Sequence, residues 1–309
     1  MKLLRRFQQC PELADGAVVT IGNYDGVHRG HQALLQRVVE EGRSRALRTC
    51  VMSFEPMPRE FFGRAPSPGR LTTWRERFEY IRQAQIDVLY LTPFSHAIAG
   101  LSPDDFVTDI LVKKLHVKLL YVGDDFRFGK KRAGDIDTLR GLGRQLGFEV
   151  AQLPSECLNG ERVSSSLIRD ALLAGDVPRA ERLLGRPFAM SGRVIRGKRL
   201  GRELGFPTAN IHPRRNSLPM SGIFAVRASW EGQSRLGVAN LGFRPTVGGG
   251  DALLEVHVFD FNGDLYGKRL TVEFVGKLRD EEHFESLDEM VVQMHQDVAD
   301  ARALLAALS

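Results

Sequence analysis

Short apolar runs alternate with segments of helical periodicity through the first half of the chain. The run Ala17–Ile21 predicts a buried strand, and apolar residues then recur at helical spacing between positions 34 and 39. Further apolar runs predict strands at 49–54, 88–91, 118–122 and 148–152, separated by helical patterns at 73–83, from 102 onwards and at 135–146. This alternation predicts a parallel sheet with helices on both faces.

The pattern changes after Leu184, where Gly185-Arg186-Pro187 interrupts it. Short alternating runs with many glycines follow, and they predict an antiparallel barrel or sandwich. These runs lie at 192–195, 222–230, 236–240, 253–260 and 269–275. A segment from 286 to 305 has apolar residues at helical spacing and predicts a terminal helix packed on the core. We therefore expect an α/β domain at 1–184 and a β domain at 185–309.

Composition narrows the class of protein. The 309 residues are 43% hydrophobic and 26% charged, which is ordinary for a soluble globular protein with a filled core. The net charge of +5 suits anionic ligands such as nucleotides, and it suits RNA as well. Three widely spaced cysteines argue against a disulfide framework or a zinc site. No signal peptide or membrane-spanning run is evident, so we expect a cytoplasmic protein with no membrane association.

The stretch Gly22–His31, which reads GNYDGVHRGH, follows the first predicted strand and leads into a helix. In open parallel sheets ligands bind at the carboxyl ends of the strands, and the start of a helix favours phosphate. The three glycines permit close backbone approach, while His28 and His31 can donate hydrogen bonds to phosphate oxygens. The HxxH spacing also occurs in zinc sites, but no third ligand is evident, so we favour phosphate.

A second candidate phosphate-binding element opens a later helix, at SSSLIR. Three serines gather hydroxyls and backbone N–H groups at the helix start, with a guanidinium behind them. An ordinary helix cap explains one serine but not three together with an arginine. We therefore interpret Ser164, Ser165 and Arg169 as part of the same nucleotide site as the two histidines.

The predicted barrel begins with another candidate site. Residues 197–210 read GKRLGRELGFPTAN, a basic segment around Gly197 and Gly201 that lacks the GKS or GKT of a Walker loop. Such a segment is either a solvated turn or a phosphate cradle. Thr208 and Asn210 are two residues apart, so in an extended chain both face the same side. Their oxygen atoms suit a metal–nucleotide complex.

Glu255 lies in the alternating run LEVHVF, where it shares one face with His257 while the apolar residues share the other. A carboxylate in this position is usually an exposed surface group. The alternative is a general base for a neutral alcohol, and a carboxylate on a rigid strand would serve that role.

The two elements of the first domain together resemble the nucleotidyltransferase superfamily, in which HxGH is followed much later by an SSS/TxxR segment. The longer motifs resemble the adenylyltransferase module of bacterial bifunctional riboflavin kinase/FAD synthetases. They read GNYDGVHRGHQ from 22, FEPMPREFF from 54, GDDFRFGKKRAGD from 123 and VSSSLIR from 163. The resemblance implies a Rossmann-like HxGH domain in which His28 and His31 contact the ATP phosphates in the transition state. The nucleotide-binding residues implied by it are Gly22, Asn23, Asp25, Gly30, Asp125, Ser164, Ser165 and Arg169.

Four positions complete the comparison with that module. Asp125 stands where some members carry asparagine, and Met57 stands where several carry histidine. Phe62 and Phe128 are candidates for the flavin pocket, and each is equally compatible with a place in the core.

The second domain resembles the riboflavin kinase module over most of its length. The motifs are GRVIRGKRLGRELGFPTANI from 192, GVANLGFRPTVGGG from 237 and LEVHVFDFNGDLYGKRLTVEFVGKLRD from 254. The resemblance implies a small antiparallel barrel in which Thr208 and Asn210 hold Mg²⁺ with ATP and Glu255 activates the riboflavin 5′-hydroxyl. The segment of Gly197 and Gly201 would cover the phosphates. Asn240 and residues 244–246 would lie around this site.

Together the resemblances imply a bifunctional enzyme of flavin cofactor biosynthesis that uses Mg²⁺. Riboflavin and ATP give FMN and ADP, and then FMN and ATP give FAD and pyrophosphate. We expect ATP, riboflavin and FMN as partners and no nucleic acid, with weak self-association left open. One alternative is an HxGH enzyme for a nicotinate nucleotide or phosphopantetheine, which would not need the barrel motifs. The other is an RNA-binding protein, for which no clear set of aromatic residues interleaved with Lys and Arg is found.

Overall fold

The computed structural model describes residues 1–5, 10–63, 69–197, 201, 204–244 and 251–308. The chain divides into two compact units, which are Met1–Ser67 with Trp74–Val163, and Pro68–Thr73 with Ser164–Ser309. This division by compactness falls after Val163, whereas the domain boundary expected from the sequence falls after Leu184. The difference concerns the helical segment at 164–184 and the short segment at 68–73, both of which are grouped with the barrel.

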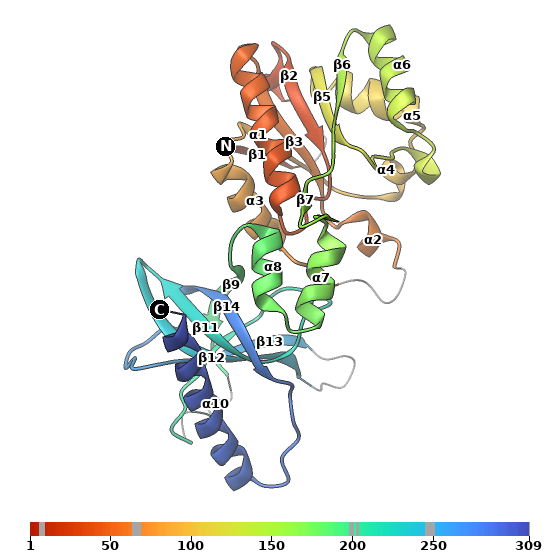
Figure 1. Cartoon of the computed structure of the whole chain (residues 1–309). Helices are drawn as coiled ribbons and strands as arrows, with labels where there is room; N and C mark the ends of the chain where they lie inside the picture. Colours follow the sequence, from red (N-terminus) through yellow and green to blue (C-terminus); the bar gives the residue numbers. More distant parts are fainter. Residues whose placement is uncertain (6–9, 64–68, 198–200, 202–203, 245–250, 309) are drawn as a thin grey trace. The chain divides into compact units, whose positions relative to one another are not determined.

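The first unit contains a six-stranded parallel sheet in the order β1-β4-β3-β2-β5-β6 (Figure 1). Its strands are β1 (Lys2–Arg5), β2 (Ala17–Ile21), β3 (Arg48–Phe54), β4 (Val88–Thr92), β5 (Val117–Gly123) and β6 (Glu149–Leu153). The predicted parallel sheet is confirmed. The sequence did not predict β1, because only Leu4 of this short edge strand is buried and no apolar run marks it.

Helices cover both faces of the sheet, as predicted. On one face lie α1 (Arg29–Ser44) and α3 (Trp74–Gln83), and on the other lie α4 (His96–Gly100), η2 (Phe106–Val112) and α6 (Ile136–Leu146). Successive residues of β2 alternate between the two cores, since Val18 packs with α1 while Ala17 and Val19 pack with η2. Shorter helices are η1 (Pro11–Leu13), α2 (Pro58–Phe61), α5 (Pro103–Asp105) and η3 (Lys130–Arg132), and a hairpin joins β7 (Cys157–Leu158) to β8 (Glu161–Arg162).

The strand order reverses direction at β2. The chain leaves β2 through α1 toward β3 and β4 on one side, and it later returns to place β5 and β6 on the other side. Such a switch point opens a crevice at the carboxyl ends of the strands, where ligands of parallel α/β sheets bind. The loop at 22–28 leaves β2 at this point.

The second unit is built on a closed six-stranded antiparallel barrel in the order β10-β13-β12-β11-β14-β9. Its strands are β9 (Phe188–Ile195), β10 (Ala209–Ile211), β11 (Gly222–Trp230), β12 (Gln233–Arg244), β13 (Asp251–Val258) and β14 (Arg269–Arg279). The barrel is therefore confirmed over the sandwich. The sequence did not predict β10 as a separate strand, because it has only three residues.

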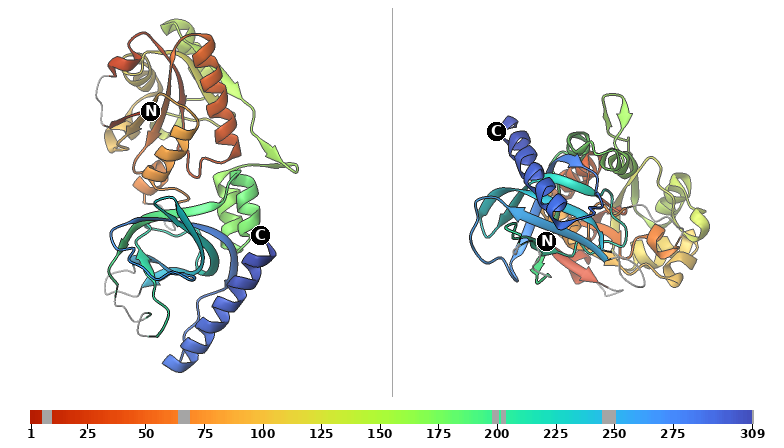
Figure 2. Two further views of the ribbon diagram at one scale, coloured as in Figure 1. Left: turned by 90° about the vertical axis from the view of Figure 1, so that its left-hand side faces the viewer. Right: turned by 90° about the horizontal axis from the view of Figure 1, so that it is seen from below.

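Among the described residues, three helices with defined bounds accompany the barrel. The terminal helix α10 (Leu287–Ala307) lies along its outside, as Figure 2 shows, and buries Ala301 and Leu305 against Ala225 and Phe259. The helices α7 (Ser165–Leu173) and α8 (Val177–Leu184) form a hairpin that contacts the barrel through α8, next to β9 and β14. The predicted terminal helix is confirmed.

Candidate active sites

The loop after β2 holds its shape against unfavourable backbone geometry. Tyr24 and Val27 have φ angles of 51° and 41°, in the left-handed region that side chains other than glycine rarely adopt. Both side chains are buried in the core beneath α1, and the Tyr24 hydroxyl forms a 2.7 Å hydrogen bond with the Thr20 hydroxyl. Packing therefore fixes a strained loop, and strain of this kind is typical of functional sites.

His28 and His31 form a stacked pair at the start of α1. Their ring centroids are 3.7 Å apart with a 20° angle between the planes. The His31 backbone N–H donates to Nδ1 of His28 at 3.4 Å, so His28 caps the helix. Because Nδ1 accepts this bond, the proton of a neutral His28 ring resides on Nε2, which can then donate to an anion. The positive end of the α1 dipole adds to this preference for phosphate.

The loop after β2 is also held by Arg77, a residue that the sequence analysis missed. Arg77 of α3 is fully buried, and its guanidinium donates to the Asn23 carbonyl at 2.6 Å and to the Phe54 carbonyl at 3.2 Å. It also forms an ion pair with Glu55 at 2.8 Å. Ser53 donates to the same Asn23 carbonyl at 3.2 Å. Arg77 therefore joins the loop at 22–28, which we call the His loop, to the end of β3.

Three further predicted residues of this unit lie in exposed or buried positions. Asp125, just beyond the carboxyl end of β5, is exposed and pairs with Arg162 of β8 at 3.0 Å. Phe62 is 56% exposed beside Phe94, with ring centroids 5.8 Å apart. Phe128 is buried in the core. Phe62 thus presents an aromatic face, whereas Phe128 has the packing of a core residue.

Ser164, Ser165 and Arg169 belong to the second unit. The Ser164 hydroxyl accepts the Leu167 backbone N–H at 3.2 Å and caps α7, as a helix-starting serine does. The Arg169 guanidinium donates through Nε to the Gly69 carbonyl at 2.6 Å. The proposed joint site of these residues with the histidines stays a prediction.

The barrel brings Asn210, Glu255 and Asn240 into one row across three strands. Asn210 of β10 lies opposite Glu255 of β13, and Glu255 lies opposite Asn240 of β12. Directly opposed residues share a face of a sheet. The flanking residues Leu254 and Val256 are fully buried in the barrel, so the row occupies its outer face.

Thr208 and Asn210 lie together at the start of β10. Nδ2 of Asn210 donates to the Thr208 carbonyl at 3.3 Å, which turns the amide oxygen of Asn210 away from that carbonyl. A hydroxyl, an amide oxygen and the neighbouring Glu255 carboxylate form the set of hard oxygen donors that Mg²⁺ prefers. The chemistry of these residues therefore fits the expected metal.

Glycine is required where the segment before β10 approaches it. A side chain on Gly197 would meet the Asn210 amide at 2.9 Å, and one on Gly201 would meet the Phe206 carbonyl at 2.5 Å. Phe206 is buried beside His257, with ring centroids 5.5 Å apart. Residues 198–200, 202–203 and 245–246 of the predicted site lie outside the described part of the chain.

Comparison with known proteins covers both units. The model of the FAD synthetase family matches residues 10–167, and that of the riboflavin kinase family matches residues 184–305. The bifunctional riboflavin kinase/FMN adenylyltransferase of Escherichia coli K12 is 46% identical over 98% of this chain and 97% of its own length. The chain belongs to the bifunctional riboflavin kinase/FMN adenylyltransferase family. The Pseudomonas fluorescens member is 48% identical over 99% of this chain and 98% of its own.

Solved structures extend the likeness to the fold. A structure described as a macrolide-efflux protein from Streptococcus pneumoniae is 28% identical and matches with a TM-score of 0.80, over 96% of this chain and 97% of its own. Among the described residues, no helix has the length and apolar character needed to cross a membrane. The resemblance inferred from the sequence motifs is confirmed by both family models.

Proposed function

We propose that the two activities of the family, riboflavin kinase and FMN adenylyltransferase, reside at the two sites described above. Their successive products are FMN and FAD. The observation that carries the first assignment is the stacked His28–His31 pair at the start of α1, at the switch point of the sheet. The polar row centred on Glu255 carries the second.

At the first site the phosphate of FMN attacks the α-phosphorus of ATP, and pyrophosphate leaves. This phosphate is already an anion, so the protein need not supply a nucleophile or a base. His28 and His31 donate hydrogen bonds to the phosphate oxygens and stabilise the charge that develops there. Ser164, Ser165 and Arg169 bind the nucleotide phosphates with them.

At the second site the Glu255 carboxylate accepts the proton of the riboflavin 5′-hydroxyl. The hydroxyl oxygen then bonds to the γ-phosphorus of ATP, and ADP leaves with the former bridging oxygen. Thr208 and Asn210 would hold Mg²⁺, which would neutralise charge on the phosphates. We propose the cytoplasm, where riboflavin, FMN and ATP are available, as the location of both reactions.

The test separates the two sites on one chain. The protein is mixed with riboflavin, ATP and Mg²⁺, and the flavins are separated by chromatography. The double variant H28A/H31A is expected to stop FAD formation while FMN accumulates. E255Q is expected to stop FMN formation yet still convert supplied FMN to FAD.

The control is the unsubstituted protein, which must form both FMN and FAD under the same conditions. Absence of both products in that control would refute the proposed function. Loss of both activities in either variant would refute the assignment of one site to each reaction.

A further inference from the structure

A second carboxylate lies beside the polar row of the barrel. Glu281 follows β14, and its carboxylate occupies the space over Gly242 of β12, where any side chain would overlap it. Gly242 lies two residues beyond Asn240, so both are on the same face of the strand. The absence of a side chain at Gly242 is therefore what lets Glu281 reach the row.

Glu281 sets the orientation of the Asn240 side chain. The Asn240 amide donates a hydrogen bond to the Glu281 carboxylate. This contact takes up the nitrogen of the amide. The other end, Oδ1 of Asn240, is buried and has no hydrogen-bond partner among the described residues. Buried acceptors are almost always paired, so an unpaired one in a native structure requires a donor, such as a water molecule or a bound ligand.

The surroundings of Glu281 agree with a place at the site. Its pKa is raised, first by burial of the carboxylate and further by the charge of Glu255, while the bond from Asn240 opposes the rise. The chain leading to Glu281 is fixed, because Arg279 binds both oxygens of Asp297 on α10 at 2.7 and 2.8 Å. Glu281 is therefore held next to the row by the frame of the barrel.

We infer that Glu281 is a positioning residue of the kinase site, which holds the Asn240 amide so that its Oδ1 accepts a hydrogen bond from a hydroxyl of the polyhydroxy alcohol substrate. The inference rests on the proposed role of Glu255, which lies directly opposite Asn240. The side chain of riboflavin carries several hydroxyls and only the terminal one reacts. A bond from Asn240 to a non-reacting hydroxyl sets which hydroxyl lies at Glu255.

The test compares the Michaelis constants of the two kinase substrates in E281Q, N240A and the double variant. N240A is expected to raise the KM for riboflavin about tenfold, the usual effect of one lost hydrogen bond, with the KM for ATP within twofold of the parent. E281Q is expected to change the same constant in the same direction. The double variant is expected to be no worse than N240A, because Glu281 acts through Asn240.

G242A offers an independent route, because the added methyl displaces the Glu281 carboxylate and leaves its charge unchanged. It is expected to raise the riboflavin KM as E281Q does. E282Q, which removes the exposed neighbouring charge, serves as the matched control with an unchanged KM. Because ATP binds at the same barrel site, an unchanged KM for ATP reports intact folding of the barrel in every variant.

An E281Q riboflavin KM within twofold of the parent, or effects of E281Q and N240A that multiply, would overturn the inference. An equal rise in the KM for ATP would overturn it as well. The two proposals fail separately. Full FMN formation in E255Q refutes the role of Glu255 as the base. An unchanged riboflavin KM in E281Q, with E255Q inactive in FMN formation, refutes only the positioning role of Glu281.

Discussion

The loop after β2 takes its two histidines from four consecutive residues, whereas the polar row of the barrel takes Asn210, Glu255 and Asn240 from three different strands. The first site depends on a local turn with a strained backbone, fixed by packing. The second depends on strand register, because a shift of one residue would turn every member of the row to the other face. Each site is therefore sensitive to a different kind of change.

The difference extends to how each site is supported. The His loop is joined to the sheet by the buried cation of Arg77, which binds one backbone carbonyl of the loop and one at the end of β3. The row on the barrel is supported by hydrogen bonds between neighbouring side chains and by glycine positions that let them approach. A single buried charge thus supports one site, while the geometry of a whole barrel supports the other.

The largest effect is expected from R77M. The substitution removes the donor to the Asn23 carbonyl and the ion pair with Glu55. Losing the hydrogen bonds of a buried guanidinium destabilises a protein by about 2 kcal/mol or more. A displaced loop lowers the rate of adenylyl transfer about 100-fold, the scale of a 1 Å misplacement at a catalytic site. Urea unfolding and FAD formation from supplied FMN measure the two effects.

The matched control lies on the same helix. Arg82 pairs with Glu79 at 2.9 Å, and both side chains are about half exposed. R82M is expected to change the free energy of unfolding by about 0.5 kcal/mol or less and to leave both activities unchanged. Equal losses of riboflavin kinase and adenylyltransferase activity in R77M would contradict a role confined to the His loop.

The candidate His site could be selected from the sequence because its chemistry is contiguous. A strand, three glycines, two histidines and a helix start can be recognised without knowing any tertiary contact. Arg77 was missed because an arginine in a helix is usually a surface residue. Its spacing from Ile81, four residues further along and fully buried, places it on the apolar side of α3 and was the available signal.

Only part of the candidate barrel site could be selected from the sequence, for the same physical reason. Thr208 and Asn210 are two residues apart, and Glu255 alternates with apolar residues, so these three could be selected from local patterns. The contact between Glu281 and Asn240 could not be predicted from local patterns, because it depends on which strands are neighbours in the closed barrel. Local patterns predict elements and faces, while register decides which side chains meet.

Alkaline pH is expected to lower the stability of the first unit and not that of the second, with an effect of intermediate size. Burial raises the pKa of the Cys10 thiol from 9.0 to about 11, and burial also raises the pKa values of Cys50 and Tyr24. All three belong to the first unit. A raised folded pKa means that the stability contribution is complete below pH 9 and is lost as the pH rises through 11. The first unit is therefore expected to weaken above pH 9.

Each unit has one tryptophan with which to follow this effect, Trp74 in the first and Trp230 in the second. Denaturant midpoints are measured by fluorescence between pH 7 and pH 10.5 in W230F, which reports the first unit, and in W74F, which reports the second. The midpoint is expected to fall above pH 9 only in W230F. Adding C10A should reduce that fall. Parallel decreases in both reporters would show that the buried acids of the first unit are not the cause.

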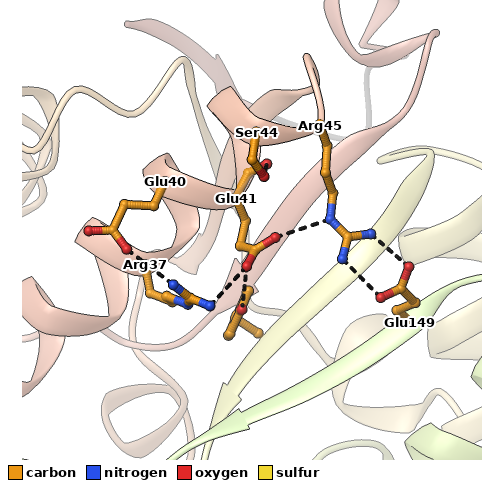
Figure 3. A network of polar contacts seen from close by, with 7 residues as sticks. Arg37, Glu40, Glu41, Ser44, Arg45 and Glu149 are labelled. Carbon is orange, nitrogen blue, oxygen red and sulfur yellow. Dashed lines mark hydrogen bonds and ion pairs between the residues drawn. The ribbon is translucent and has the colours of Figure 1, made fainter.

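The smallest effect is expected at the amino ends of the strands, whereas the His loop follows the carboxyl end of β2. Arg45 follows α1 and binds the Glu149 carboxylate at 2.6 and 3.0 Å, while its Nε binds Glu41 at 3.1 Å (Figure 3). The pKa of Glu149 is lowered, chiefly by the hydrogen bonds from Arg45. The Glu149 side chain is nevertheless 64% exposed, so solvent screens the pair.

A double-mutant cycle of R45M and E149Q measures that pair. We expect a coupling free energy of about 0.5 kcal/mol, typical of an exposed ion pair, that decreases in 1 M salt. Both activities should stay unchanged, because Glu149 begins β6 at the amino end of the strands, whereas ligands bind at the carboxyl ends. A loss of FAD formation in E149Q would mean that the position of the His loop depends on the whole sheet and not on Arg77 and the local turn.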